Sequence, residues 1–278
     1  MCDHCVIDSV KSRMLSRRGL LGGGLAAAAA GIASPAFAQD AAAKPGVARS
    51  MPANSIVDLT HELYPEFPTF FGDQQFFMEQ KFSYAEHKFN LFELRVNEHT
   101  GTHVDAPLHF SADGQSVAEI PVDKLMAPLV VVDIREKAEK DADAQVTPDD
   151  LKAWIAAHGD MPENCCVAMN SGWARHLDTE KFRNADQDGT MHFPGFHVEA
   201  VQLLLEGSAV GIAVDTLSLD FGMSPDFAVH YAWLPEGRWG LECIAGLDDM
   251  PATGATLIVG APKHRGGSGG PARVFALT

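Results

Sequence analysis

Four side chains of types that bind metal ions lie within eleven residues of one another: His99, His103, Asp105 and His109. On a helix, His99 and His103 would share a face while Asp105 would point away from it. On a strand all four would share a face, but His99 and His103 would lie ~13 Å apart. Binding of one ion by these residues therefore requires a bend in the chain between the two histidines.

Two residues of the segment favour such a bend. Gly101 tolerates backbone angles that are closed to other residues, and Pro107 prevents a helix from continuing. We therefore expect a ligand-bearing turn at the end of a strand. Imidazole and carboxylate ligands suit zinc or manganese, and the two oxygens of Asp105 could bridge two ions, which an imidazole cannot do.

A second ion would need further ligands, and spacing alone does not select them. Each of the other histidines after residue 38 is a candidate by residue type: His61, His87, His158, His176, His192, His197, His230 and His264. His61 follows a strand-like run and could point into a substrate pocket. An equal interpretation is that it is a polar residue with ordinary hydrogen-bond partners.

The segments around the motif alternate between strand and helix patterns. The predicted strands are 55–60, 92–97, 129–134, 166–170, 209–215 and 256–260, and the predicted helices are 148–158 and 197–206. Residues 92–97 alternate apolar and polar side chains, which is typical of a half-buried strand, and this strand leads to His99. Thr147 and Pro148 are start signals of the first helix, and Gly159 is its stop signal. The alternation indicates an α/β fold, and no composition break suggests a second domain.

A glycine-rich loop, Gly-Gly-Ser-Gly-Gly-Pro, covers residues 266–271. Glycine-rich loops can bind phosphate through backbone N–H groups. This loop lacks the Lys-Ser/Thr pair of a P-loop, and Pro271 removes one backbone donor. We therefore expect no nucleotide-binding role for it.

The first 38 residues have the pattern of an export signal. Arg17 and Arg18 precede a stretch without formal charge, and Ala36, Phe37 and Ala38 form a small-x-small cleavage site. The pattern resembles a twin-arginine signal cleaved after Ala38, which predicts a periplasmic protein exported in the folded state. Retention as a membrane anchor is the alternative, which the weakly hydrophobic Ala/Gly-rich stretch disfavours. Residues 39–54 would form a flexible linker and residues 55–278 the folded domain.

The protein is strongly acidic. Its formal net charge is −16, and loss of residues 1–38, which hold four basic and two acidic residues, would make it −18. Nucleic acid and anionic membranes would repel such a protein, so we expect a small-molecule substrate, no nucleic-acid partner and no stable membrane association after cleavage. Cys165, Cys166 and Cys243 would remain, and an odd number that includes an adjacent pair predicts no disulfide framework.

The motif His99-x-Gly101-Thr102-His103-x-Asp105-x-Pro107-x-His109 resembles, at every defined position, the signature of the cyclase-type metal-dependent hydrolases. This family includes bacterial kynurenine formamidases and isatin hydrolases. Residues 58–60, 68–73, 215–220 and 270–274 fit the same family. The resemblance implies a single-domain, cyclase-like swivelling β/β/α fold with a mixed sheet and flanking helices. It also implies a homo-oligomer, either a dimer or a tetramer.

The resemblance further implies a second ligand pair, a histidine followed twelve residues later by a glutamate, and His230 and Glu242 have that spacing. His99, His103 and Asp105 would hold one ion. Asp105, His230 and Glu242 would hold the other, and His109 would be the catalytic proton shuttle. The implied reaction is hydrolysis of a carbon–nitrogen amide bond, in a linear aryl formamide or a cyclic amide, by water activated by two zinc or manganese ions. Hydrolysis of a lactone or ester is the alternative within the family.

Phe70 is the predicted substrate-binding residue. Kynurenine formamidases place a tryptophan at the position of Phe70 and a proline at that of Phe71. Phe70 preserves an aromatic wall but changes its shape. The resemblance therefore implies an aryl substrate and disfavours formylkynurenine itself.

Two other classes of function stay open. His103, Asp105 and the distant His264, together with Arg273, mimic the facial triad and cosubstrate arginine of an iron and 2-oxoglutarate oxygenase. That interpretation leaves the other histidines of the motif unexplained. The third interpretation is a periplasmic protein that binds metal without catalysis.

Overall fold

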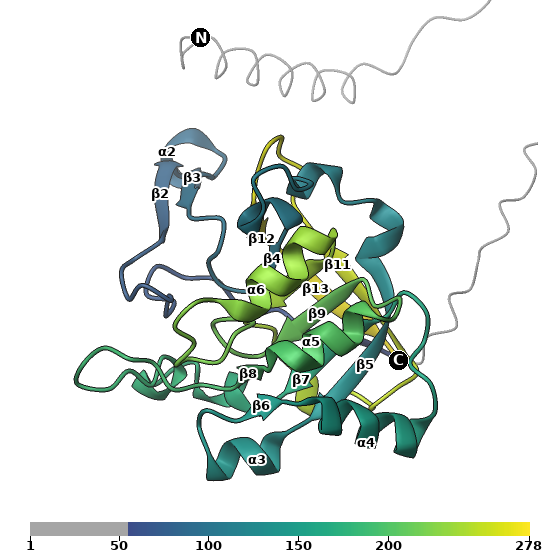
Figure 1. Cartoon of the computed structure of the whole chain (residues 1–278). Coiled ribbons are helices and arrows are strands. Elements are labelled where there is room, and N and C mark those ends of the chain that lie inside the picture. The colour runs from purple at the N-terminus through teal and green to yellow at the C-terminus, as the bar shows by residue number, and fades with distance from the viewer. Residues whose placement is uncertain (1–54) are drawn as a thin grey trace, which may run out of the picture. The chain divides into compact units, whose positions relative to one another are not determined.

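Nine strands of the described part of the chain form one mixed β-sheet (Figure 1). The computed structural model describes residues 55–278, so the predicted signal (1–38) and linker (39–54) lie outside the described residues. The strand order is β1-β13-β11-β5-β7-β9-β10-β4-β12. In this order the strands are Ile56–Asp58, Arg273–Leu277, Ala255–Gly260, Met126–Asp133, Cys166–Asn170, Gly211–Val214, Trp239–Glu242, His103–Asp105 and Gly269–Pro271.

The centre of the sheet is parallel and its flanks are antiparallel. β5, β7, β9 and β10 run parallel, whereas β11 joins β5 and β4 joins β10 in antiparallel pairs. Parallel neighbours need crossover connections. These contain α3 (Arg135–Lys140) and α4 (Pro148–His158) before β7, α5 (Val198–Leu205) before β9, and α6 (Ala228–Trp233) before β10. The fold is thus α/β with a mixed sheet and flanking helices, as predicted.

Successive residues of the central strands face two different cores. Val130 of β5 packs in a cluster with Leu151 of α4, and α4, α5 and α6 cover that face of the sheet (Figure 1). Val131 packs in a second cluster with Leu257 of β11, on the opposite face. Burial on both faces is expected for parallel strands, and it explains why these strands are continuous apolar runs in the sequence.

Both predicted helices are confirmed. α4 begins after Thr147, which forms a capping box with Asp150, and it ends before Gly159, whose φ is +89°. Trp154 on its apolar stripe donates a hydrogen bond from Nε1 to the carbonyl oxygen of Val131. α5 has His197 as its N-cap, and the ring of His197 accepts a hydrogen bond from the N–H of Glu199.

The predicted strands are also found, but the half-buried character expected for residues 92–97 is wrong. Among the described residues, β3 (Leu91–Val96) pairs only with β2 (Phe76–Phe82), and α2 (Tyr84–His87) connects the two. All six residues of β3 are exposed. The period-2 pattern is real, but its apolar face lies on a hairpin outside the main sheet, so no described residues bury it.

The remaining elements are short. β6 (Gln145–Val146) and β8 (Gly195–Phe196) form a two-stranded parallel pair. Single 3-10 turns cover Pro107–Phe110, Val117–Glu119, Val122–Leu125, Trp173–His176, Glu180–Phe182, Leu234–Glu236 and Leu247–Asp249. No helix among residues 55–278 has the length and apolar character needed to cross a membrane.

Candidate metal centre and active site

The histidine-rich motif bends as predicted, but two of its ligands lie within a strand. Gly101 has a φ of +69° in the turn that carries His99 toward β4. His103 and Asp105 occupy the two ends of β4, and alternate residues of a strand point to the same face. The bend lies before β4 and brings the ring of His99 back over these two side chains.

β10 contributes Glu242 through its register with β4. Glu242 lies directly opposite His103 in this antiparallel pair, and Gly240 lies opposite Asp105. One oxygen of Glu242, Oε1, accepts a hydrogen bond of 2.9 Å from the N–H of Leu219. A Cβ atom at residue 240 would lie 3.3 Å from Asp105 Oδ2, so glycine leaves room for the Asp105 carboxylate.

α6 contributes His230, and Asp220 orients it. The Asp220 carboxylate accepts hydrogen bonds from the backbone N–H groups of Val229 and His230 at the start of α6. It also lies 2.6 Å from His230 Nδ1. This contact leaves His230 Nε2 to face Glu242 Oε1 at 3.2 Å and Asp105 Oδ2 at 3.7 Å.

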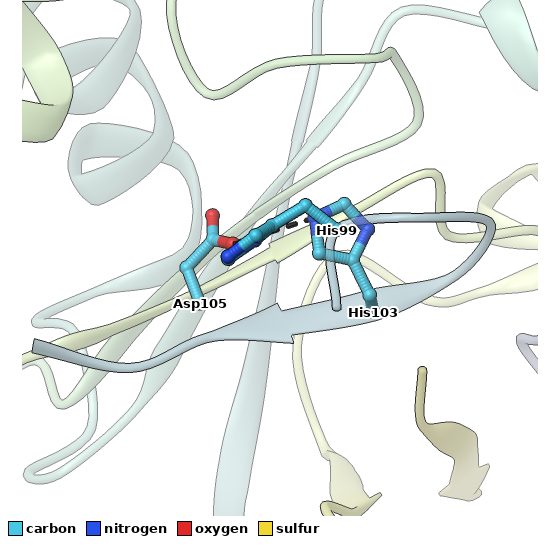
Figure 2. A group of neighbouring side chains, drawn as sticks. All are labelled: His99, His103 and Asp105. Atoms are coloured by element: carbon cyan, nitrogen blue, oxygen red, sulfur yellow. Dashed lines mark hydrogen bonds and ion pairs between the residues drawn. The ribbon is translucent and has the colours of Figure 1, made fainter. Parts of the chain in front are cut away.

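The five predicted ligands form two groups that share Asp105. Figure 2 shows the first group, His99, His103 and Asp105. Asp105 Oδ1 lies 2.7 Å from His99 Nδ1 and 3.3 Å from His103 Nε2. The second group is Asp105, His230 and Glu242, and within each group the ligand atoms all lie within 4.8 Å of one another. Glu242 also touches the first group, since its Oε2 is 3.3 Å from His103 Nε2.

The chemistry of these atoms fits a metal ion. His103 Nε2 and Asp105 Oδ2 are buried, and neither has a hydrogen-bond partner among the described residues. The buried Asp105 and Glu242 carboxylates have only histidines as ion-pair partners within residues 55–278. Burial opposes a charge on His103, yet the two carboxylates raise its pKa to about 10. The site therefore favours positive charge, and its nitrogen and oxygen ligands suit zinc or manganese.

His109 lies beside the ligands on the 3-10 turn that follows β4. Its ring stacks on that of His99 with centroids 3.7 Å apart and is 5.8 Å from the ring of His230. Burial lowers the pKa of His109 to about 4, so the ring is neutral at pH 7. A neutral imidazole next to a metal site can accept a proton.

A cavity of about 370 Å³ opens above the ligands. Aromatic side chains form much of its wall, with the rings of Phe70 and Phe110 5.7 and 5.6 Å from that of Phe227. Phe70, the predicted substrate-binding residue, is therefore part of the wall. The sequence did not single out Phe110, Phe227 and Cys243 as wall residues, although Phe110 directly follows His109 and Cys243 directly follows Glu242, because their side chains are not typical metal ligands of this motif.

Several residues considered from the sequence do not enter the site. The ring of His61 packs against Phe67 and Phe182, and His61 is not part of the cavity wall. His264 bonds to Glu98 Oε1 at 2.6 Å, and Arg273 pairs with Asp58. Since His264 joins neither group of ligands, the facial triad of an oxygenase is not assembled in residues 55–278.

The buried groups near the ends of β7 are also separate from the site. Cys165 and Cys166 are free and buried. Ser171 donates a hydrogen bond of 2.6 Å from Oγ to Asp215, which also accepts the N–H of Trp173. The contacts of Ser171 hold the strand end, and none of Cys165, Cys166 and Ser171 lines the cavity above the ligands.

Comparison with known proteins gives one family. Residues 57–221 match the family model described as putative cyclase. The chain is 35% identical over 192 residues to the isatin hydrolase of Roseibium aggregatum, a match that covers 66% of this chain and 72% of that protein. It is 28% identical over 221 residues to the kynurenine formamidase of Salinibacter ruber, with 79% of this chain and 95% of that protein covered.

A solved structure extends the likeness to the fold. Isatin hydrolase A from Labrenzia aggregata, bound to benzyl benzoate, matches with a TM-score of 0.75 and 36% sequence identity. The match covers 81% of this chain and 93% of that chain.

Proposed function

The chain belongs to the putative cyclase family, and we propose that it is a metal-dependent amidohydrolase that opens the carbon–nitrogen bond of a small aryl amide. The substrate would be a cyclic amide or a linear aryl formamide. The single observation that carries the proposal is the buried carboxylate of Asp105, which two groups of predicted ligands share beneath an aromatic cavity that the other four of these ligands line. The relatives named for isatin and kynurenine support the same reaction class.

The proposed cofactors are two divalent ions, zinc or manganese. His99, His103 and Asp105 would hold one, and Asp105, His230 and Glu242 the other. Ions of this kind would lower the pKa of a water molecule toward ~7 and polarise the substrate carbonyl. The two unpartnered buried atoms, His103 Nε2 and Asp105 Oδ2, support this assignment because an ion would satisfy both.

His109 is proposed as the catalytic base and acid. Its ring lies against His99 but belongs to neither group of ligands, so its nitrogens remain available for proton transfer. A ring nitrogen of His109 would take the proton of the attacking water and return it to the leaving nitrogen of the amide. The lowered pKa of His109 supports this role because the ring starts without the proton it must accept.

The cavity wall supports an aryl substrate. Phe70, Phe110 and Phe227 present ring faces and edges above the ligands, and Phe71 is 76% exposed at the cavity rim. Planar aromatic groups pack well between such rings. We propose that Phe70 and its neighbours hold the aryl ring, so that the amide carbonyl lies over the shared carboxylate.

Ion content and a substrate panel test this function. Purified wild type should carry about two zinc or manganese ions per chain and hydrolyse a member of a panel of isatin, formylkynurenine, lactones and esters. His109→Ala should keep the ions and lose roughly 10²–10⁴-fold in kcat. His158→Ala, at the exposed end of α4, is the matched control and should keep full activity.

Three results would overturn the proposal. A single iron with turnover of 2-oxoglutarate would indicate an oxygenase. A full ion load without hydrolysis of any panel member would indicate a protein that only binds metal. Hydrolysis of lactones or esters but of no amide would be consistent with the proposed active site but would show that the bond cleaved is an ester bond and not an amide bond.

Location and assembly are separate proposals. We infer that residues 1–38 direct export of the folded chain to the periplasm and that the mature protein is a homodimer or homotetramer. A reporter fused after Ala38 should leave the cytoplasm only while Arg17 and Arg18 are intact. Light scattering on the purified protein should give two or four times the mass of one chain, and a monomer would contradict the assembly proposal.

A further inference from the structure

The glycine-rich loop at 266–271 packs around His99. β12, at the end of this loop, pairs with β4, so Gly269 lies opposite Asp105. A Cβ atom on Gly269 would lie 2.7 Å from His99 Cε1, and one on Gly267 would lie 2.5 Å from Glu98 Oε1. Glycine is therefore required at these two positions because the backbone of the loop approaches the side chains closely.

Ser268, between these glycines, connects His99 to Glu98. Its Oγ lies 3.0 Å from His99 Nε2 and 2.6 Å from Glu98 Oε2. Its backbone N–H also donates to Glu98 Oε2 at 3.1 Å. The other Glu98 oxygen, Oε1, lies 2.6 Å from His264 Nε2.

The direction of these hydrogen bonds follows from proton counting. A hydroxyl group has one proton, and a carboxylate can only accept, so Ser268 Oγ–H donates to Glu98. The Ser268 oxygen then accepts from His99, which requires the proton of that ring to be on Nε2. Nδ1, which faces Asp105 Oδ1 at 2.7 Å, is then the ring nitrogen of His99 that can offer a lone pair to an ion bound between the two side chains.

The other two histidine ligands have the opposite orientation. Nδ1 of His103 bonds to the carbonyl oxygen of Gly101 at 2.8 Å, and Nδ1 of His230 lies 2.6 Å from Asp220. Both rings therefore present Nε2 to the shared carboxylate. Each histidine has one nitrogen fixed by an outer partner, and only in His99 is that partner a hydroxyl supported by a second residue.

We propose that Ser268 and Glu98 are positioning residues that fix the tautomer of His99 and select Nδ1 as its metal-ligating atom. The inference rests on the proposed metal function and adds the reason why one of the two ion sites depends on the C-terminal loop. Outer partners of histidine ligands commonly change metal affinity by about 10–100-fold. Because Asp220, and not this loop, orients His230, the effect is confined to the ion held by His99, His103 and Asp105.

The first test reads the tautomer directly. Long-range ¹H–¹⁵N NMR of the zinc-loaded wild type should show His99 bound through Nδ1, with its proton on Nε2, and His103 and His230 bound through Nε2. Zinc bound to His99 Nε2 would overturn the inference. This measurement needs no variant, so it does not depend on whether a substituted protein folds.

The second test measures zinc affinity by titration of the metal-free protein against a chromophoric chelator. Ser268→Ala should lower the affinity for one of the two zinc ions by about 10–100-fold and leave the affinity for the other within about two-fold of wild type. Ser111→Ala removes another hydroxyl that bonds to a carboxylate, here Asp113, and should change neither affinity. Equal losses at both ions, or no loss at either, would contradict a selective role.

A double-variant comparison separates positioning from general destabilisation. Glu98→Gln should lower the affinity for the same zinc ion that Ser268→Ala affects. The double variant should lose little more affinity than either single variant, because both residues act through one hydrogen bond to His99. Independent, multiplicative losses of affinity would overturn the inference that Glu98 acts on His99 through Ser268. If wild type itself binds fewer than two ions, the proposed function fails; if wild type binds two and Ser268→Ala binds them equally well, only this inference fails.

Discussion

Both carboxylate oxygens of Asp105 face histidine nitrogens. Oδ1 lies near His99 and His103, and Oδ2 lies 3.7 Å from His230. Because the carboxylate is fully buried, water cannot replace a lost partner. Both groups of ligands therefore depend on this one side chain, whereas each histidine serves a single group.

Asp105→Asn should remove both ions, because the amide keeps the shape of the carboxylate but loses its charge and one oxygen acceptor. Each zinc affinity should fall by roughly 100-fold or more. His230→Ala should remove one ion only. Ion content after gel filtration measures both variants, and retention of one full ion by Asp105→Asn would show that the carboxylate is not shared.

His109 should make the metal-free protein less stable in acid. Its pKa is about 4 in the folded state and 6.5 ordinarily, so between these values the unfolded chain binds more protons. The free energy of unfolding therefore rises with pH through this window, and the stability that the neutral ring contributes is lost on acidification. When the pH is lowered from about 7.5 to about 5, the free energy of unfolding measured in urea should fall by about 1–2 kcal/mol more for wild type than for His109→Asn. An equal loss in both proteins would contradict this assignment.

The spacing of residues along the sequence predicted only those site residues that are close to one another in sequence. His99, His103, Asp105 and His109 could be grouped because eleven residues limit how far apart they can lie. His230 and Glu242 came only from the family resemblance. Asp220 and Ser268 were missed as partners of histidines, since Ser268 is 169 positions from His99 and spacing carries no information at that range.

At the scale of elements, β4 holds the ligands because it lies between β10 and β12. A shift of one residue in either pair would turn His103 and Asp105 to the other face of the sheet. Gly240 and Gly269 lie opposite Asp105 on the two sides, so no side chain crowds the carboxylate. The pairing of β4 with β10 and β12 therefore sets the orientation of these side chains and keeps the space around the Asp105 carboxylate free.

Gly240→Ala should disturb this arrangement. Its Cβ would lie 2.7 Å from Leu219 Cδ1 and 3.3 Å from Asp105 Oδ2, which requires Leu219 or the strand to shift. The free energy of unfolding should fall by about 1–3 kcal/mol, and zinc affinity should fall as well. Gly207→Ala, where a Cβ meets only the Leu204 carbonyl at 3.4 Å, is the control for urea unfolding and should change stability little.

Element type was predictable where local signals decide it. The capping residues around α4 set its bounds, and the apolar run of β7 gave a buried strand. The burial of β3 was not predictable, because alternation shows only that one face is apolar. Whether another element covers that face is decided by the tertiary arrangement, and within residues 55–278 β2 is the only strand that pairs with β3.

At the scale of the whole molecule, ion binding should couple to folding. A ligand at about 100 times its Kd stabilises the folded state by about 2.7 kcal/mol, which corresponds to roughly 5–10 °C in Tm for a domain of this size. Calorimetry before and after chelation should therefore show a fall of at least about 5 °C, reversed by zinc. Asp105→Asn should show no response to the chelator, and an equal fall in that variant would refute the coupling.

The pairing of β12 with β4 also sets the order in which the protein matures. Of the elements around the shared carboxylate, β12 is the last to be synthesised, and Ser268 precedes it directly. The nascent chain can present individual histidines, but it cannot present the assembled centre until translation has passed this strand. Insertion of the proposed ions would thus be a step of the finished domain, and the compartment in which folding ends would decide which ion pool the protein samples.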